Sequence, residues 1–127
     1  MKQFIYTDKA PKAIGIYAQA TKAGNTLYVS GQIPLDPNTQ EIVAGNFSKQ
    51  TEQVLLNLQA IIETAGATLD DILKLNIYLT DLTNFAEVNS VMATFFTEPY
   101  PARACVEVKA LPKGVPVEMD AVVHLSE

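Results

Sequence analysis

Residues 54–79 read VLLNLQAIIETAGATLDDILKLNIYL, and the periodicity of this stretch changes halfway along it. The first half repeats apolar residues with the 3.6-residue period of a helix, at Val54, Leu55, Leu58, Ile61, Ile62 and Ala65. Gly66 follows these positions and suits a left-handed helix C-cap. The second half alternates, with Leu73, Leu75, Ile77 and Leu79 on one face. The stretch therefore predicts a helix from about Ser48 to Ala65, followed by a strand over residues 72–79.

The residues after this stretch repeat the order of helix and strand. Asn84 and Glu87 have the spacing of a capping box, and Pro99 and Pro101 would end the helix that it starts. Apolar residues lie at helical spacing between these two signals, at Phe85, Val88, Met92 and Phe95. A second helix followed by a strand is the result.

Two alternating segments close the chain, at residues 102–109 and 117–125, with a Pro- and Gly-containing turn between them. In the first, Arg103 and Cys105 lie on the face opposite Ala102, Ala104, Val106 and Val108. In the second, Glu118, Asp120, Val122 and His124 lie opposite Val117, Met119, Ala121, Val123 and Leu125.

The first third of the chain has the features of strands and turns. Residues 4–6 form a short apolar run, and residues 15–22 and 26–30 flank Ala23-Gly24-Asn25, which reads as a hairpin. The whole order is β-β-β-α-β-α-β-β in a single α+β domain over residues 1–127, with both helices on one face of a mixed six-stranded sheet. The opposite face also needs cover, which oligomerisation would provide.

Composition excludes several classes of protein. The net charge of −5 argues against a nucleic-acid binder, which needs a basic patch. One Cys and one His provide neither a disulfide framework nor a structural zinc site. Charged residues make up only 18%, which is low for a soluble domain and suggests that a partner subunit covers some surface. No signal peptide or membrane span is evident, so we expect a cytoplasmic protein.

Arg103 is the only arginine beside eight lysines, and its position in the strand suggests at least partial burial. A buried guanidinium needs an anion. A fixed pair with Glu107, Glu118 or Asp120 is the reading that the pattern alone favours. The other reading is a clamp for a ligand's carboxylate or phosphate, since arginine binds a carboxylate bidentately and lysine does not.

Cys105 shares the strand face of Arg103. A small buried apolar side chain is the favoured interpretation, because no base is evident beside it. A Cys105–His124 dyad would require the two side chains within hydrogen-bond reach.

One set of motifs resembles the reactive intermediate deaminase family, RidA/YjgF. Its C-terminal signature corresponds to Tyr100-Pro101-Ala102-Arg103-Ala104-Cys105-Val106-Glu107-Val108, Leu111-Pro112-Lys113 and Val117-Glu118-Met119. Segments within residues 13–19, 30–37, 66–72 and 79–89 also match, so the resemblance covers essentially the whole chain.

The resemblance implies a chorismate-mutase-like fold, a homotrimer with ligand sites between subunits, and no cofactor or metal. It also implies hydrolysis of 2-iminoacids or their enamine tautomers, such as 2-iminobutyrate and 2-iminopropionate, to 2-ketoacids and ammonia. Such substrates are made by PLP-dependent dehydratases, with which the protein would be functionally coupled. In this reading Arg103 binds the substrate carboxylate and Glu118 positions the water, while the pocket walls include Tyr17, Ser30, Gly31, Asn89 and Cys105.

The chain departs from the family pattern at two places. The common Gly-Pro-Tyr-Ser-Gln loop reads Gly15-Ile16-Tyr17-Ala18-Gln19, which bears on substrate preference. The usual Ser after the arginine is Ala104, on the opposite strand face, where we expect little effect.

Two other functions compete: a non-enzymatic trimer that binds small carboxylates as a sensor or chaperone, and a ribonuclease. The acidic charge and the single His speak against the ribonuclease.

Overall fold

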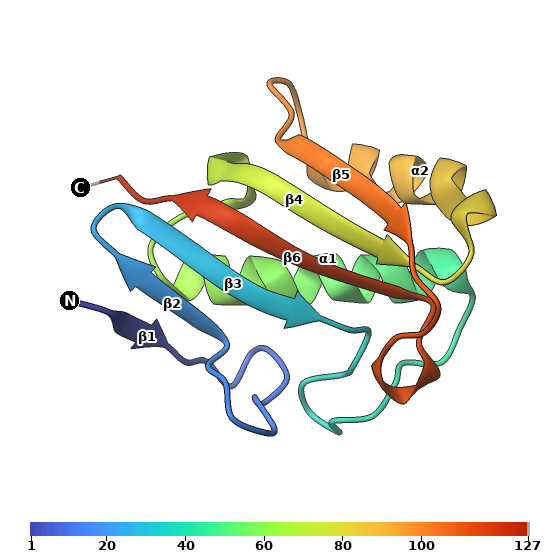
Figure 1. Ribbon diagram of the computed structural model, residues 1–127, viewed down its shortest axis with the longest axis horizontal. Coiled ribbons are helices and arrows are strands. Elements are labelled where there is room, and N and C mark those ends of the chain that lie inside the picture. Colours follow the sequence, from blue (N-terminus) through green and yellow to red (C-terminus); the bar gives the residue numbers. More distant parts are fainter. Residues whose placement is uncertain (127) are drawn as a thin grey trace.

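Strands and helices follow one another in the order that the sequence patterns predict (Figure 1). The computed structural model describes residues 1–126. Its elements are β1 (Gln3–Ile5), β2 (Ala20–Ala23), β3 (Thr26–Gln32), α1 (Phe47–Thr64), β4 (Ile72–Leu79), α2 (Phe85–Phe95), β5 (Ala102–Glu107) and β6 (Val117–His124). Short 3₁₀ turns lie at Leu69–Asp71, Leu82–Asn84 and Pro112–Gly114.

The six strands form one mixed sheet in the order β1-β2-β3-β6-β4-β5. The pair β4 and β5 is parallel, because α2 connects them as a crossover, and every other neighbouring pair is antiparallel. Both helices lie on the same side of the sheet, behind it in Figure 1, which confirms the predicted layering. The last strand of the chain, β6, occupies the centre of the sheet, whereas β5 lies at an edge.

Helix α1 begins and ends at the residues that its sequence favours. The Asn46 side chain accepts a hydrogen bond from the backbone N–H of Lys49 at 2.9 Å. Gly66 has a φ of 92°, and the following Ala67 N–H donates to the Ile62 carbonyl at 3.1 Å. This is the Schellman arrangement, so the predicted role of Gly66 is confirmed.

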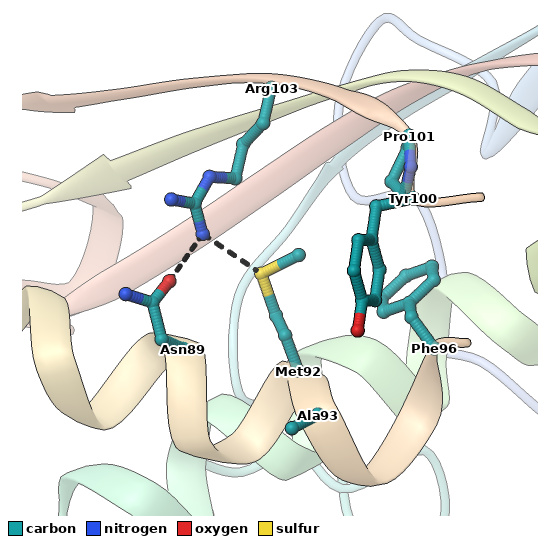
Figure 2. Close-up of a pocket in the computed structure, with 7 residues that line it drawn as sticks. All are labelled: Asn89, Met92, Ala93, Phe96, Tyr100, Pro101 and Arg103. Atoms are coloured by element: carbon teal, nitrogen blue, oxygen red, sulfur yellow. Dashed lines mark hydrogen bonds between the residues drawn. The ribbon is translucent and has the colours of Figure 1, made fainter. Parts of the chain in front are cut away.

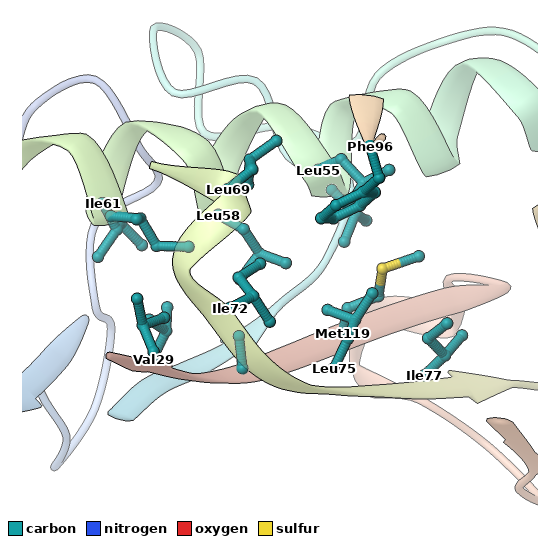
Figure 3. Packing of buried hydrophobic residues seen from close by; sticks show 14 of the residues in the cluster. Val29, Leu55, Leu58, Ile61, Leu69, Ile72, Leu75, Ile77, Phe96 and Met119 are labelled. Atoms are coloured by element: carbon teal, nitrogen blue, oxygen red, sulfur yellow. The ribbon is translucent and has the colours of Figure 1, made fainter. Parts of the chain in front are cut away.

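The core lies between the sheet and α1 (Figure 3). Leu55, Leu58 and Ile61 of the helix are fully buried against the sheet. The inward positions of β4 and β6 meet them, namely Leu75, Ile77, Leu79, Val117, Met119, Ala121 and Val123. The alternation predicted for β6 is therefore confirmed, and its other face carries Glu118, Asp120, Val122 and His124.

Three local expectations were wrong. Leu73 is 54% exposed and Ile72 is buried instead, because a β-bulge between Ile72 and Lys74 shifts the alternation of β4. Asn84 makes no capping hydrogen bond, because a 3₁₀ turn precedes α2 and Asp81 caps the Thr83 N–H instead. Of the strand expected over residues 15–22, only the end is extended, since β2 begins at Ala20.

No helix in residues 1–126 combines the length and the apolar character that crossing a membrane requires.

Candidate functional site

Arg103 projects from β5 toward α2, on the helix-covered side of the sheet (Figure 2). Its Nη1 donates to Asn89 Oδ1 at 2.5 Å and to the Met92 sulfur at 3.5 Å. The guanidinium carbon also lies 4.9 Å from the centroid of the Phe85 ring, within cation–π range. Three residues of α2 thus contact the guanidinium, and two of them, Asn89 and Met92, accept from the same terminal nitrogen.

No carboxylate within residues 1–126 forms a salt bridge with Arg103, so the fixed ion pair that the pattern favoured is absent there. Glu118 and Asp120 lie on the opposite face of the sheet, and the carboxylate of Glu107 accepts a hydrogen bond from the Leu82 N–H at 2.9 Å. The expected burial was also wrong: Arg103 is exposed, because β5 is an edge strand with a neighbour on one side only. The charge therefore remains available to a ligand.

A cavity of about 380 Å³ lies beside this arginine. It lies between α2 and the start of β5 and is partly open to solvent. Its lining is mainly apolar and consists of Asn89, Met92, Ala93, Phe96, Tyr100, Pro101 and Arg103. In Figure 2, Arg103 and Tyr100 extend from the side of β5, and Met92 and Phe96 belong to α2 and its C-terminal end. A cationic group thus borders an apolar space.

Cys105, two residues along β5, packs against the core. Burial raises the pKa of its thiol, and the nearby Arg103 charge offsets only part of this effect. The thiol is therefore protonated at neutral pH, which supports the apolar interpretation. The Cys105–His124 dyad is wrong, since Cys105 aligns with Ile77 on the helix side and His124 lies on the other face at the far end of β6.

Glu118 lies on the face of the sheet that carries no helix, which we call the bare face, directly opposite Tyr78 of β4. A β-bulge in β3 brings Gly31 beside it, so closely that a Cβ built on Gly31 would overlap Oε2 and lie 2.9 Å from the carboxyl carbon. Burial raises the pKa of the Glu118 carboxyl, and the negative charge of Asp120 raises it further. Glu118 is thus better suited to take and release a proton than a fully solvated carboxylate.

Asp120 is held by two side chains of β4 on the same face. Asn76 Nδ2 donates to one carboxylate oxygen at 2.7 Å, and Tyr78 Oη donates to the other at 2.9 Å. Partial burial and this hydrogen bond raise the pKa of Tyr78 to about 12. Sequence reasoning missed Asn76 and Tyr78, although their alternate positions in residues 72–79 already placed them on one face with a charged or polar lining.

Ser30 connects β3 to the loop before β2. Its hydroxyl donates to the Ala18 carbonyl at 2.6 Å, and its backbone N–H donates to the Gln19 carbonyl at 2.9 Å. The buried Gln19 side chain in turn bonds both backbone groups of Thr7, at 2.8 and 3.0 Å. Gln19 is thus an anchor that sequence reasoning did not single out, and the Ser30 hydroxyl holds the loop.

Tyr17 lies in that loop and is 52% exposed, while Ile16 beside it is fully exposed. Tyr17 and Gly31 line a second cavity, of about 230 Å³. The structure therefore divides the predicted site residues into two groups: Asn89, Arg103 and Cys105 on the helix side of the sheet, and Tyr17, Ser30, Gly31 and Glu118 around β3 and the bare face. One chain brings together the members of each group, and it keeps Arg103 and Glu118 on opposite faces.

Residues 1–126 contain no group of three or more Cys, His, Asp or Glu side chains placed to hold a metal ion. The chemistry of these two groups is that of a cation next to an apolar cavity and of a carboxyl with a raised pKa.

Comparison with known proteins identifies relatives of the whole chain. A RutC family protein of Pyrococcus horikoshii is 52% identical over 98% of each chain. A protein of Dermatophagoides farinae named 2-iminobutanoate/2-iminopropanoate deaminase is 41% identical and covers 96% of this chain and 95% of its own length. The crystal structure of RidA from the Antarctic bacterium Psychrobacter sp. PAMC 21119 superimposes with a TM-score of 0.94, at 52% identity, over 97% of this chain and 99% of that one.

The structural similarity confirms the chorismate-mutase-like α+β fold expected from the sequence. The sequence model of the family described as endoribonuclease L-PSP matches residues 7–125, which is nearly the full length. The chain therefore belongs to the RidA/YjgF family.

Proposed function

We propose that the protein hydrolyses reactive 2-iminoacids and their enamine tautomers, such as 2-iminobutyrate and 2-iminopropionate, to 2-ketoacids and ammonia. The observation that carries this proposal is the guanidinium of Arg103, which has no carboxylate partner in residues 1–126 and borders a cavity of about 380 Å³. Arginine binds carboxylates bidentately, and the substrates of this reaction carry one. The deaminase name of the Dermatophagoides relative supports the same reaction class.

The site requires two copies of the chain. Arg103 and Glu118 lie on opposite faces of one sheet, so Glu118 of a second copy has to meet Arg103 of the first. Apolar side chains stand exposed on surfaces that such an assembly would cover, including Phe4 at 75%, Tyr28 at 55% and Val106 at 47%. A closed ring in which each copy offers one half-site to each neighbour gives identical sites, and a homotrimer is the assembly we propose.

The reaction needs few protein groups, because a protonated imine carbon is already electrophilic. Water adds to that carbon and gives a carbinolamine, whose C–N bond then breaks to release ammonia and leave the ketone. Arg103 holds the carboxylate of the substrate, an interaction worth about 1.5–3 kcal/mol for a hydrogen bond to a charged group. Glu118 accepts a proton from the attacking water and returns it to the departing ammonia, a general acid–base role worth about 10²–10⁴-fold in rate.

The raised pKa of Glu118 suits both steps. A carboxyl whose pKa lies closer to neutrality accepts a proton more readily in the first step and still releases it in the second. Gly31 supports this role, because the missing side chain leaves the space in which the Glu118 carboxyl lies.

The test is a coupled assay in which a PLP-dependent serine or threonine dehydratase generates the enamine in the presence of the protein. We expect the wild type to accelerate release of ketoacid and ammonia, and Arg103→Ala and Arg103→Lys to abolish the acceleration while the assembly persists. Lys49→Ala is the matched control, because it removes an exposed positive charge whose one salt bridge within residues 1–126 is to Glu52 of the same helix. Retained hydrolysis in intact Arg103→Ala assemblies would overturn the role of this residue.

The alternative is a non-enzymatic protein that binds small carboxylates in the same cavity next to Arg103. Binding of a ketoacid together with unchanged rates in the dehydratase assay would establish that alternative.

The family description as an endoribonuclease is the observation in favour of RNA cleavage. The net charge of −5 and the single His oppose it, and cleavage that survives purification but disappears in Arg103→Ala would be needed to support it.

A further inference from the structure

The cavity next to Arg103 offers more space than the carboxylate of a substrate occupies. Its volume of about 380 Å³ falls within the range of small-molecule sites, about 300–1,000 Å³. The side chain of 2-iminopropionate is a single methyl group, which leaves most of this space unfilled.

The walls of the cavity are built for apolar contact. Met92 contributes a flexible, polarisable thioether, and Phe96 and Tyr100 contribute aromatic rings. Ala93 is the small residue that leaves the space open on the α2 side. Met92 and Phe96 are buried, so these walls are fixed by the core, whereas Tyr100 is 63% exposed and forms the outer edge.

The orientation of Arg103 connects the cavity to the substrate. Asn89 and the Met92 sulfur both bond Nη1, so one terminal nitrogen faces α2 and the rest of the guanidinium remains available for a carboxylate. Figure 2 shows Met92 between Arg103 and the aromatic pair of Tyr100 and Phe96. Because Arg103 itself lines the cavity, a group attached to the carbon next to a carboxylate bound by Arg103 lies at the border of this apolar space.

We propose that the cavity binds the side chain of the substrate, and that the protein prefers 2-iminoacids with large apolar side chains over those with a methyl or ethyl group. The preference in catalysis rests on the proposed deaminase function, whereas binding of the side chain in the cavity does not. The preferred substrates have isobutyl, thioether or benzyl side chains. The reactions that supply them are those that convert large apolar amino acids to imines.

The experiment compares kcat/KM for imines with methyl, isobutyl and benzyl side chains, generated in place by an amino-acid oxidase with catalase. We expect the wild type to favour the larger side chains at least tenfold, since each buried methylene is worth about 10-fold or more in discrimination. Ala93→Leu narrows the cavity and should lower the large-to-small ratio at least tenfold. Ala86→Leu, the same change at an exposed position of α2 outside the cavity, should leave the ratio unchanged.

A binding measurement separates this inference from the deaminase proposal. Calorimetry with two stable ketoacids, 4-methyl-2-oxopentanoate and pyruvate, requires no catalysis. We expect the wild type to bind the larger ketoacid more tightly, and Ala93→Leu to lose this preference. That result would support the cavity assignment even if no imine is hydrolysed, and only the deaminase proposal would then fail. Hydrolysis of all imines with no preference for size, unchanged in Ala93→Leu, would overturn the cavity assignment and leave the deaminase proposal standing.

A second variant covers the case in which Ala93→Leu does not fold or assemble. Tyr100→Ala removes an exposed wall without touching the core, and it should lower the same ratio several-fold. An unchanged ratio in Tyr100→Ala, with the wild type showing no preference for the larger ketoacid, would also overturn the assignment.

Discussion

The surroundings of Arg103 and those of Glu118 are built in opposite ways. Arg103 stands on an exposed edge strand, fixed by contacts to α2 and open to a cavity. Glu118 stands on the central strand, against the backbone of Gly31, where burial and a neighbouring carboxylate raise its pKa. The first region has the features of a binding site and the second those of a proton carrier. Since one sheet separates them, a single chain would not combine the two roles that we propose for Arg103 and Glu118.

The largest effect that this comparison predicts is recovery of activity on mixing two inactive variants. Arg103→Ala and Glu118→Gln should each lose at least about 10²-fold in kcat/KM, because each lacks one half of every site. Co-expressed at equal amounts, they should regain about one quarter of wild-type activity, since one interface in four in a randomly mixed ring combines two intact halves. The assay is kcat/KM on purified mixed assemblies. Mixed assemblies with no activity would show that both groups act within one chain.

Gly31→Ala tests how closely Gly31 and the Glu118 carboxyl pack against each other. The φ of Gly31 lies outside the left-handed region, so the backbone accepts alanine, but the new Cβ overlaps the carboxylate of Glu118. Displacement of that flexible carboxylate by about 1 Å should cost up to about 10²-fold in kcat/KM. The free energy of unfolding should change by less than about 1 kcal/mol, as denaturant titration would measure.

The control for Gly31→Ala is the double variant with Glu118→Gln. If alanine acts through Glu118, it adds little to the loss that Glu118→Gln already causes, because the two changes affect one group. Independent, multiplied losses would contradict this explanation.

The sequence predicted the order of elements well, because periods of 3.6 and 2 residues and the turn residues are local signals. It did not predict the position of β5 at the edge of the sheet, since strand order depends on contacts between distant segments. Arg103 was therefore expected to be partly buried and paired. The bulge that exposes Leu73 also has no local signal, as Ile72 and Leu73 are equally apolar.

The candidate site residues came only from the family resemblance, and their division into two groups on the two faces of the sheet required the structure. Alternation assigns the two faces of each strand separately, but it does not say which face of residues 102–109 matches which face of residues 117–125. Arg103 and Glu118 were for this reason treated as possible partners within one chain. The positions of the helices distinguish the faces. Met119 lies in the core on the helix side of the sheet, so Glu118 lies on the other face, whereas Arg103 contacts α2 on the helix side.

A smaller effect is expected from Asp120→Asn. The Asp120 carboxylate repels a second negative charge and so raises the pKa of Glu118, while the other groups facing Glu118 are the uncharged Tyr78 of β4 and the backbone of Gly31. Removing the charge lowers that pKa, and a base that ionises at lower pH keeps its activity at lower pH. The acidic limb of the kcat/KM profile should therefore move to lower pH.

The side-chain amide that Asp120→Asn introduces can still accept a hydrogen bond through its oxygen, so Tyr78 or Asn76 retains a partner and the sheet face persists. Asp70→Asn, which removes an exposed carboxylate from a 3₁₀ turn, should leave the profile unchanged. A shift of the acidic limb to higher pH would contradict the assigned electrostatics.

The smallest effect should come from Cys105→Ala, which asks whether the binding region holds a nucleophile. Cys105 lies on the strand face of Arg103, yet burial raises the pKa of its thiol, and the only His lies on the other face of the sheet. A protonated thiol without a base is a poor nucleophile, and hydrolysis of an imine by water needs none. The variant should keep kcat/KM within about threefold of wild type, and iodoacetamide should alkylate the wild-type thiol slowly at pH 7. The contrary result would be complete loss of activity in a Cys105→Ala assembly that retains its size and its affinity for a ketoacid. That result would indicate a covalent intermediate on sulfur, and proton transfer by Glu118 would then no longer suffice for the chemistry.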